Sequence, residues 1–219
     1  IECAWDQKPD LILASGDMLS GDREEGDAIA VALLSRLSDL APVCFVNGNH
    51  EMCVERHQPE RYQKFMDDLK NGGVQVLHNE TACFWIDGEK VAVTGYELPW
   101  EYYRRFSRRH PSVVGMERSI GKRKQDAYQI LLTHNPVFFE EYTAWGADFT
   151  FAGHLHGGFI RLPYFGGVIS PQFQLFPKYD HGLYQMDTSS MVVGAGMGNH
   201  SGLFRINNPT EIVTVRIKR

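Results

Sequence analysis

Several features that mark other classes of protein are missing from this chain. No apolar run approaches the roughly 20 residues that a helix needs to span a bilayer. The net charge of −5 lacks the basic excess of a nucleic-acid binder, so no nucleic-acid partner is indicated. The four cysteines have no Cys-x-x-Cys spacing, which argues against a zinc finger. We therefore expect a cytoplasmic chain whose cysteines are mostly buried small hydrophobes.

The beginning of the chain also lacks familiar signals. The sequence starts at Ile1 rather than at Met, without the charged head and apolar core of a signal peptide. We interpret this as an N-terminally truncated sequence, in which a preceding segment could carry a membrane anchor. With 219 residues and 43% hydrophobic content, the chain can bury one substantial core. We predict a single domain over residues 1–219.

Apolar runs first alternate with segments of helical periodicity, and strands dominate afterwards. Strands are predicted at residues 11–14, 43–46, 74–77, 83–86, 91–94, 130–132, 149–152, 183–186, 191–193 and 212–217. Helices are predicted at residues 24–40, 59–71 and 136–145, and residues 1–7 resemble the end of another. This order predicts an α/β fold with layered, mixed sheets rather than one purely parallel sheet.

Four of the predicted strands are followed by short motifs of metal-ligating residues. In chain order the motifs are Gly16-Asp17, Gly48-Asn49-His50-Glu51, Thr133-His134 and Gly153-His154-Leu155-His156. Open α/β sheets gather ligands at the carboxyl ends of their strands, so motifs distant in sequence can converge in space. Each motif alone is compatible with an ordinary turn, but coincidence is a poor explanation for the ordered set.

The side chains of these motifs define the chemistry of the predicted site. Asp17 offers a carboxylate, Asn49 a carbonyl oxygen, and His134, His154 and His156 offer imidazoles. Mixed nitrogen and oxygen ligands without thiolates suit Mn, Fe or Zn better than Ca. A tight turn can splay His154 and His156 so that each serves one of two adjacent ions. A carboxylate such as Asp17 can bridge two ions roughly 3.5–4 Å apart, as in two-metal phosphoryl chemistry.

With these motifs the sequence resembles the calcineurin-like metallophosphoesterase superfamily over nearly its whole length. The resemblance implies a four-layer α/β/β/α sandwich, two divalent metal ions at one edge of the sheets, and a bridging hydroxide as nucleophile. It makes Asp17 the bridging ligand. Asn49, His134 and His154 complete one metal site, and His156 serves the other.

The same resemblance gives His50 a role other than metal binding. His50 approaches the scissile phosphate and protonates the leaving oxygen or stabilises the transition state. Independently of the resemblance, we expect Glu51 to orient His50 rather than to bind metal. The segments Gly157-Gly158, Arg161-Leu162-Pro163 and Arg205 to Ile212 further resemble small bacterial phosphoesterases of the superfamily. Some of those are membrane-anchored, and some relatives hydrolyse the pyrophosphate of UDP-diacylglucosamine, so a phosphate-containing small molecule or lipid-linked substrate is implied.

One member of the family's motif series is absent. No Asp-x-His motif precedes Asp17, although in the family this motif ends the first strand. One metal site therefore has all of its expected protein ligands, whereas the other has only Asp17 and His156. We favour a truncated sequence from which the first strand is missing, and hence a phosphoesterase. The alternative is a non-catalytic module that holds a single metal and recognises an anion without hydrolysing it.

Two further segments are unusual in composition. Residues 104–124 contain eight of the 22 lysines and arginines and one acid, Glu117, with aromatic residues nearby. They could face an anionic substrate or a membrane surface, in a peripheral association, or form a solvated insertion. Residues 159–179 are rich in aromatic side chains, which we expect to pack a long loop onto the core.

Overall fold

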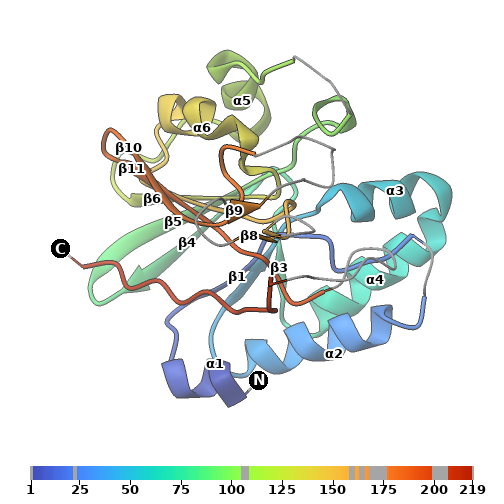
Figure 1. The fold of residues 1–219 in the computed structure, drawn as a ribbon. Helices are drawn as coiled ribbons and strands as arrows, with labels where there is room; N and C mark the ends of the chain where they lie inside the picture. The colour runs from blue at the N-terminus through green and yellow to red at the C-terminus, as the bar shows by residue number, and fades with distance from the viewer. Residues whose placement is uncertain are drawn as a thin grey trace.

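The computed structural model describes residues 2–21, 24–104, 109–157, 161–162, 166–167, 177–198 and 207–218 (Figure 1). Its α-helices are α1 Glu2–Gln7, α2 Asp27–Ser38, α3 Asn49–His57, α4 Pro59–Asn71, α5 Val113–Ile120 and α6 Phe139–Trp145. Two 3-10 turns are η1 Trp100–Tyr102 and η2 Pro136–Phe138. The strands are β1 Ile12–Ala14, β2 Val43–Phe45, β3 Gln75–Val76, β4 Thr81–Ile86, β5 Glu89–Tyr96, β6 Tyr128–Thr133, β7 Phe149–Ala152, β8 Arg161–Leu162, β9 Gly166–Gly167, β10 Gly182–Met186 and β11 Ser189–Val193.

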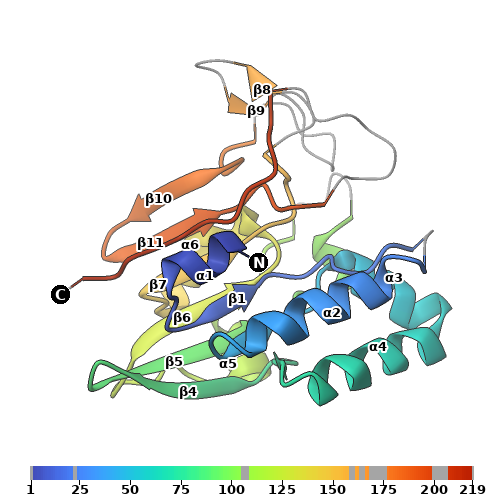
Figure 2. The same ribbon diagram turned by 90° about the horizontal axis from the view of Figure 1, so that it is seen from below.

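The strands form two main sheets and a short antiparallel pair of β8 and β9. The first sheet has three parallel strands in the order β1-β2-β3. The second has six strands in the order β10-β11-β7-β6-β5-β4, which Figure 2 shows from one edge to the other. Its four central strands are parallel, whereas β10 and β4 at the edges are antiparallel to their neighbours. The predicted α/β fold with parallel and mixed sheets flanked by helices is therefore confirmed.

Three apolar layers hold these elements together. One layer packs α2 and α4 on the three-stranded sheet, with Phe45, Leu34 and Leu69 fully buried. A second layer lies between the two sheets and joins Cys44 and Val46 to residues of β5 and β6. The third packs α5 and α6 on the opposite face of the six-stranded sheet (Figure 1). Because alternate residues of a strand point to opposite faces, β5 and β6 contribute side chains to two of these layers.

Local sequence signals explain where several helices begin and end. Pro59 occupies the first position of α4, where a missing N–H costs nothing, and Gly72 follows its last residue. The side chain of Ser112 accepts a hydrogen bond from the N–H of Gly115 and caps α5. Gly146 ends α6 with a φ of 107°, a conformation that favours glycine. The predicted helix 59–71 matches α4, and the predicted helix 136–145 consists of η2 followed by α6.

The strand predicted at residues 212–217 was wrong. Residues 208–218 have no regular secondary structure, although they are rich in β-branched residues. Strand propensity depends on a partner and a half-buried face, and Ile212, Val213 and Ile217 are exposed instead. The cysteine expectation was also wrong for most positions, because Cys3 and Cys83 are exposed and Cys53 is partly exposed. Only Cys44 is buried, which raises the pKa of its thiol to about 12.

The two unusual segments are only partly described by the structure. Within residues 104–124, the helix α5 buries Met116 and Ile120 against the core, so this part is not a solvated insertion. Residues 105–108 lie outside the described residues, as does most of the aromatic stretch 159–179. Tyr179, at its end, packs edge-to-face on Phe139, as expected. In the described part of the chain, no helix is both long and apolar enough to cross a membrane.

Candidate metal centre

The first two motifs meet because two glycines allow their loops to touch. Gly16 follows β1 with a φ of 90°, and a Cβ there would overlap the backbone of Gly48. A Cβ on Gly48 would in turn overlap the Asp17 carboxylate. Only residues without a side chain permit such a close approach of two backbones. The carboxylate of Asp17 is thereby held at the N-terminus of α3, where the N–H of His50 donates to its Oδ1 at 2.9 Å.

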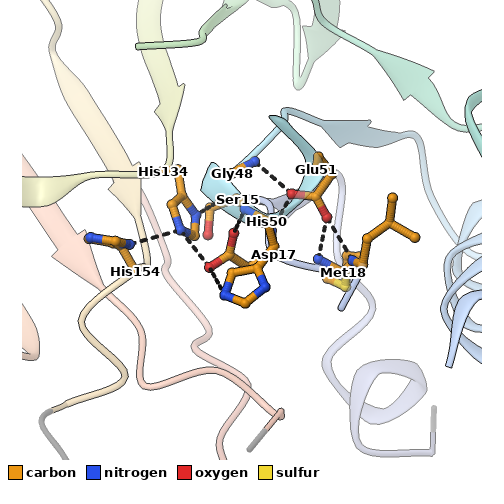
Figure 3. A network of polar contacts seen from close by, with 9 residues as sticks. Ser15, Asp17, Met18, Gly48, His50, Glu51, His134 and His154 are labelled. Carbon is orange, nitrogen blue, oxygen red and sulfur yellow. Dashed lines mark hydrogen bonds and ion pairs between the residues drawn. The ribbon is translucent and has the colours of Figure 1, made fainter. Parts of the chain in front are cut away.

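The other two motifs bring imidazoles to the same carboxylate (Figure 3). His134 follows β6, and its Nε2 lies 3.0 Å from Asp17 Oδ2. Its Nδ1 lies 2.5 Å from the carbonyl oxygen of Ser15, which fixes the ring orientation. His154 follows β7, with a φ of 66°, and its Nδ1 lies 3.2 Å from His134 Nε2. Asp17, His134 and His154 thus offer ligand atoms that all lie within 4.8 Å of one another.

Two buried polar atoms of the predicted ligands have no hydrogen-bond partner in the described part of the chain. They are Asn49 Oδ1 and His154 Nε2. A buried acceptor or imidazole nitrogen without a partner is costly unless something else satisfies it. A divalent ion bound by nitrogen and oxygen ligands would do so, and the donor set is typical of Mn, Fe or Zn. The residues present therefore fit a metal ion.

The charges of the group also favour metal binding. Burial alone raises the pKa of the Asp17 carboxyl, but the charge and hydrogen bond of His134 outweigh it and hold that pKa well below its usual range. Burial lowers the pKa of His134, but the carboxylate of Asp17 more than offsets this and raises it. The pKa of His154 is well below its ordinary value because of burial and the charge of His134. An ionised Asp17 beside a neutral His154 suits a cation, since metals bind deprotonated ligands.

His50 lies at the rim of the group rather than inside it. Its Nε2 is 4.0 Å from Asp17 Oδ2, and its side chain is 25% exposed. His50 is in the first turn of α3, a helix that we did not predict. A partly exposed imidazole beside a buried carboxylate can exchange protons with a bound molecule, which the buried His134 cannot do as easily.

Glu51 connects the loop that carries Asp17 to the beginning of α3, where Asn49 lies. Its fully buried carboxylate accepts hydrogen bonds from four backbone N–H groups, those of Asp17, Met18, Leu19 and Gly48, at 2.6–2.8 Å (Figure 3). Burial and the charge of Asp17 raise the pKa of Glu51, while three of these hydrogen bonds oppose the shift. We expected Glu51 to orient His50, whereas the contacts of its carboxylate are with the backbone of both ligand loops.

We expect Glu51→Gln to destabilise the metal-free protein by about 3 kcal/mol, because the amide NH₂ would face buried donors and leave them unsatisfied. Urea unfolding in the presence of a chelator measures the change. Glu55→Gln is the matched control, because Glu55 is exposed on the same helix. Equal stabilities of the two variants would contradict the role given to the four hydrogen bonds.

His156 stays a predicted ligand. It is partly exposed, has a φ of 50°, and follows the buried Leu155. Its charge contributes to the lowered pKa of His154, so the two imidazoles are near each other.

Tyr103 is a neighbour of the site that sequence reasoning did not single out. Its buried ring lies 5.3 Å from the His154 ring, edge-on, and 6.1 Å from that of His134. Burial, the nearby Tyr142, and the charge of Asp17 raise the pKa of its phenol well above 10. The interleaving of aromatic and basic residues at 100–109 was the only signal in the sequence, and it did not distinguish Tyr103 from its neighbours.

Together, the layered α/β sheets and the Asp-His-His group at their carboxyl ends define a metal-binding α/β protein. The chain belongs to the Calcineurin-like phosphoesterase family, whose model matches residues 2–158. The match contains all of the motifs from Gly16-Asp17 to Gly153-His154-Leu155-His156.

Several curated proteins are similar to most of this chain. An uncharacterized metallophosphoesterase, YkuE of Bacillus subtilis, is 25% identical over 97% of this chain and 69% of its own length. The phosphodiesterase YaeI of Escherichia coli is 26% identical over 97% of this chain and 72% of its own. The UDP-2,3-diacylglucosamine pyrophosphatase LpxG of Chlamydia trachomatis is 25% identical over 68% of this chain and 43% of its own.

Among solved structures, the phosphopantetheinyl hydrolase PptH of Mycobacterium tuberculosis has the same kind of fold. The two share a TM-score of 0.51 and 14% identity, over 88% of this chain and 82% of that one. At this identity the similarity shows the fold alone.

Proposed function

We propose that this chain is a metal-dependent phosphoesterase that hydrolyses phosphodiester, pyrophosphate or phosphomonoester bonds through a dinuclear metal centre. The observation that carries the proposal is the buried group of Asp17, His134 and His154, and the unpartnered, buried Oδ1 of Asn49 supports it. The order of helices, three-stranded sheet, six-stranded sheet and helices supports the four-layer α/β/β/α sandwich of this family as one domain.

Asp17, Asn49, His134 and His154 would hold one ion, and Asp17 and His156 would contribute to the other. The ions, Mn, Fe or Zn by ligand type, would neutralise developing charge on the phosphate oxygens and activate a water for attack. His134 keeps its orientation through Ser15, and Glu51 fixes the backbone from which Asp17 projects. Because these contacts already orient the ligand side chains, little conformational entropy is lost when an ion binds.

His50 would be the general acid. Its position beside Asp17, with a quarter of its side chain exposed, allows it to donate a proton to the leaving oxygen. The exposed part of the His50 side chain can meet a substrate, while the buried His134 and His154 would hold the ion.

The activities named for the relatives favour substrates with an organic group on both sides of the scissile bond. YaeI is a phosphodiesterase, and LpxG is a UDP-2,3-diacylglucosamine pyrophosphatase. We extend this to the present chain as a phosphate-containing small molecule or lipid-linked substrate. The exposed Arg104 and Arg109 are in the basic segment that could meet such a substrate or an anionic membrane surface.

The second candidate function is a non-catalytic module that binds one metal and an anion. It is favoured by one observation: the described residues bring metal-capable side chains together in a single group of three. The two functions differ in turnover rather than in metal binding, so a hydrolysis assay separates them.

Asn49→Ala should weaken Mn²⁺ binding about tenfold or more, because it removes a neutral oxygen ligand from the most complete site. Elemental analysis after equilibration with Mn²⁺, and calorimetric titration, measure the loss. Asn71→Ala is the control, since Asn71 is exposed at the end of α4. An Asn49 variant that binds Mn²⁺ as tightly as the Asn71 variant would remove Asn49 from the ligand set.

A further inference from the structure

The segment that follows residue 206 is attached to the last metal-ligand motif by one buried amide. Asn208 is only 4% exposed, and its Nδ2 donates a hydrogen bond to the backbone carbonyl of His156. The same amide lies against the backbone of Gly157, which has a φ of 68°. A Cβ on Gly157 would lie 2.9 Å from Asn208 Oδ1, so the contact requires a glycine there.

A second attachment lies three residues further along the chain. Glu211 Oε1 accepts a hydrogen bond from the N–H of Ala195 at 2.7 Å and lies 2.8 Å from His181 Nε2. The N–H of Glu211 donates to the carbonyl of Gly196 at 3.3 Å. Asn208 and Glu211 therefore connect the tail to two different loops.

These two loops leave the same edge of the six-stranded sheet. β7 and β11 are parallel neighbours, and their last residues, Ala152 and Val193, are paired. The N–H of Gly194 donates to the carbonyl of Ala152 at 3.1 Å, so the sheet pairing continues into the first residue of the loop. The tail crosses both loops at the point where the β7 loop carries His154 and His156.

The β7 loop has an unfavourable backbone that needs such support. His154 and His156 both have positive φ values, of 66° and 50°, which residues other than glycine rarely adopt. Such conformations persist when the surrounding structure holds them. His154 is buried among its neighbours, whereas His156 is partly exposed, and the amide of Asn208 acts directly on the backbone of His156.

We propose that Asn208 is a positioning residue that holds the backbone of His156 so that its imidazole can serve the second metal ion, with Glu211 as the anchor of the tail. This rests on the proposed function, in which His156 is a ligand. The segment Arg205 to Ile212 resembles a subgroup of the family in sequence. The contacts of Asn208 and Glu211 give this segment a role in the metal centre. Partners of ligands in this position typically change metal affinity by about 10–100-fold when they are removed.

The test uses the full chain with Asn208→Ala and Asn208→Asp, both of which lack the donor, and Thr210→Ala as the control. Thr210 is exposed in the same tail. The first measurement is hydrogen exchange in the segment 153–157 of the metal-free protein, which does not depend on metal or activity. The second is calorimetric titration with Mn²⁺ alone. Circular dichroism and thermal unfolding confirm that each variant folds.

We expect faster exchange in this segment for both Asn208 variants, and Mn²⁺ binding about tenfold weaker for Asn208→Ala, while Thr210→Ala matches the wild type. Unchanged exchange would overturn the proposal, and so would faster exchange with unchanged Mn²⁺ affinity, because the tail would then be a structural support only. If the variants show this pattern but the wild-type protein hydrolyses no phosphate ester, Asn208 would remain a positioning residue and the proposed function would be overturned instead.

Discussion

Asp17→Asn should abolish both tight metal binding and hydrolysis. Asp17 supplies the buried negative charge of the site, and its Oδ2 lies 3.0 Å from His134 and 4.0 Å from His50. Asparagine has nearly the same shape but no charge, so the side chains around it need not move. We expect the Kd for Mn²⁺ to rise about 100-fold, the upper end of the effects seen for groups that only support ligands.

The comparison needs a control and a check of the fold. Asp10→Asn removes one charge from an exposed position just before β1 and should leave Mn²⁺ binding unchanged. Circular dichroism should show the same secondary structure in both variants. Tight Mn²⁺ binding by a folded Asp17→Asn variant would show that the ion is held elsewhere, and the site described above would be incorrect.

His50→Asn should, unlike Asp17→Asn, separate the two effects: the variant should still bind Mn²⁺ but should lose turnover. General acids contribute about 10²–10⁴-fold to rate, so kcat for an aryl phosphodiester should fall by about that factor. Metal content persists because His50 lies at the rim of the group, partly exposed, rather than among Asp17, His134 and His154. Steady-state kinetics at saturating Mn²⁺ measure the effect.

His57→Asn is the matched control, since His57 is exposed at the far end of the same helix, α3. Leaving groups of different pKa add a second criterion. The loss in the His50 variant should be largest for poor leaving groups, which need a proton, and smallest for nitrophenolate. Turnover equal to that of the His57 control would remove His50 from the chemistry.

The sequence was sufficient to predict those elements of the fold that depend on local sequence patterns. Apolar runs gave the positions of β1, β2, β6 and β7, and the observed fold brings the loops that follow β1, β6 and β7 together. Pro59 and Gly72 gave the bounds of α4 without error. Parallel strands in two packed sheets place their carboxyl ends on one side, so the convergence of Asp17, His134 and His154 follows once the fold class is correct.

Features that depend on tertiary contacts could not be predicted from the sequence. The Glu51 carboxylate accepts hydrogen bonds from backbone N–H groups 32–34 residues away. The local sequence around Glu51 does not indicate these partners. The same holds for Tyr103, which follows η1 and contacts the ring of His154. In the tail, β-branched residues predicted a strand, but side-chain bonds from Asn208 and Glu211 fix its course instead.

The most direct test of the central claim is a titration of the metal-free chain with Mn²⁺ while hydrolysis of bis-p-nitrophenyl phosphate, a pyrophosphate diester and an aryl phosphomonoester is followed. We expect turnover of at least one substrate that rises in proportion to Mn²⁺ bound and is absent in Asp17→Asn. A wild-type protein that becomes saturated with Mn²⁺ and hydrolyses none of the three would contradict the claim and identify the chain as a metal-binding module without phosphoesterase activity.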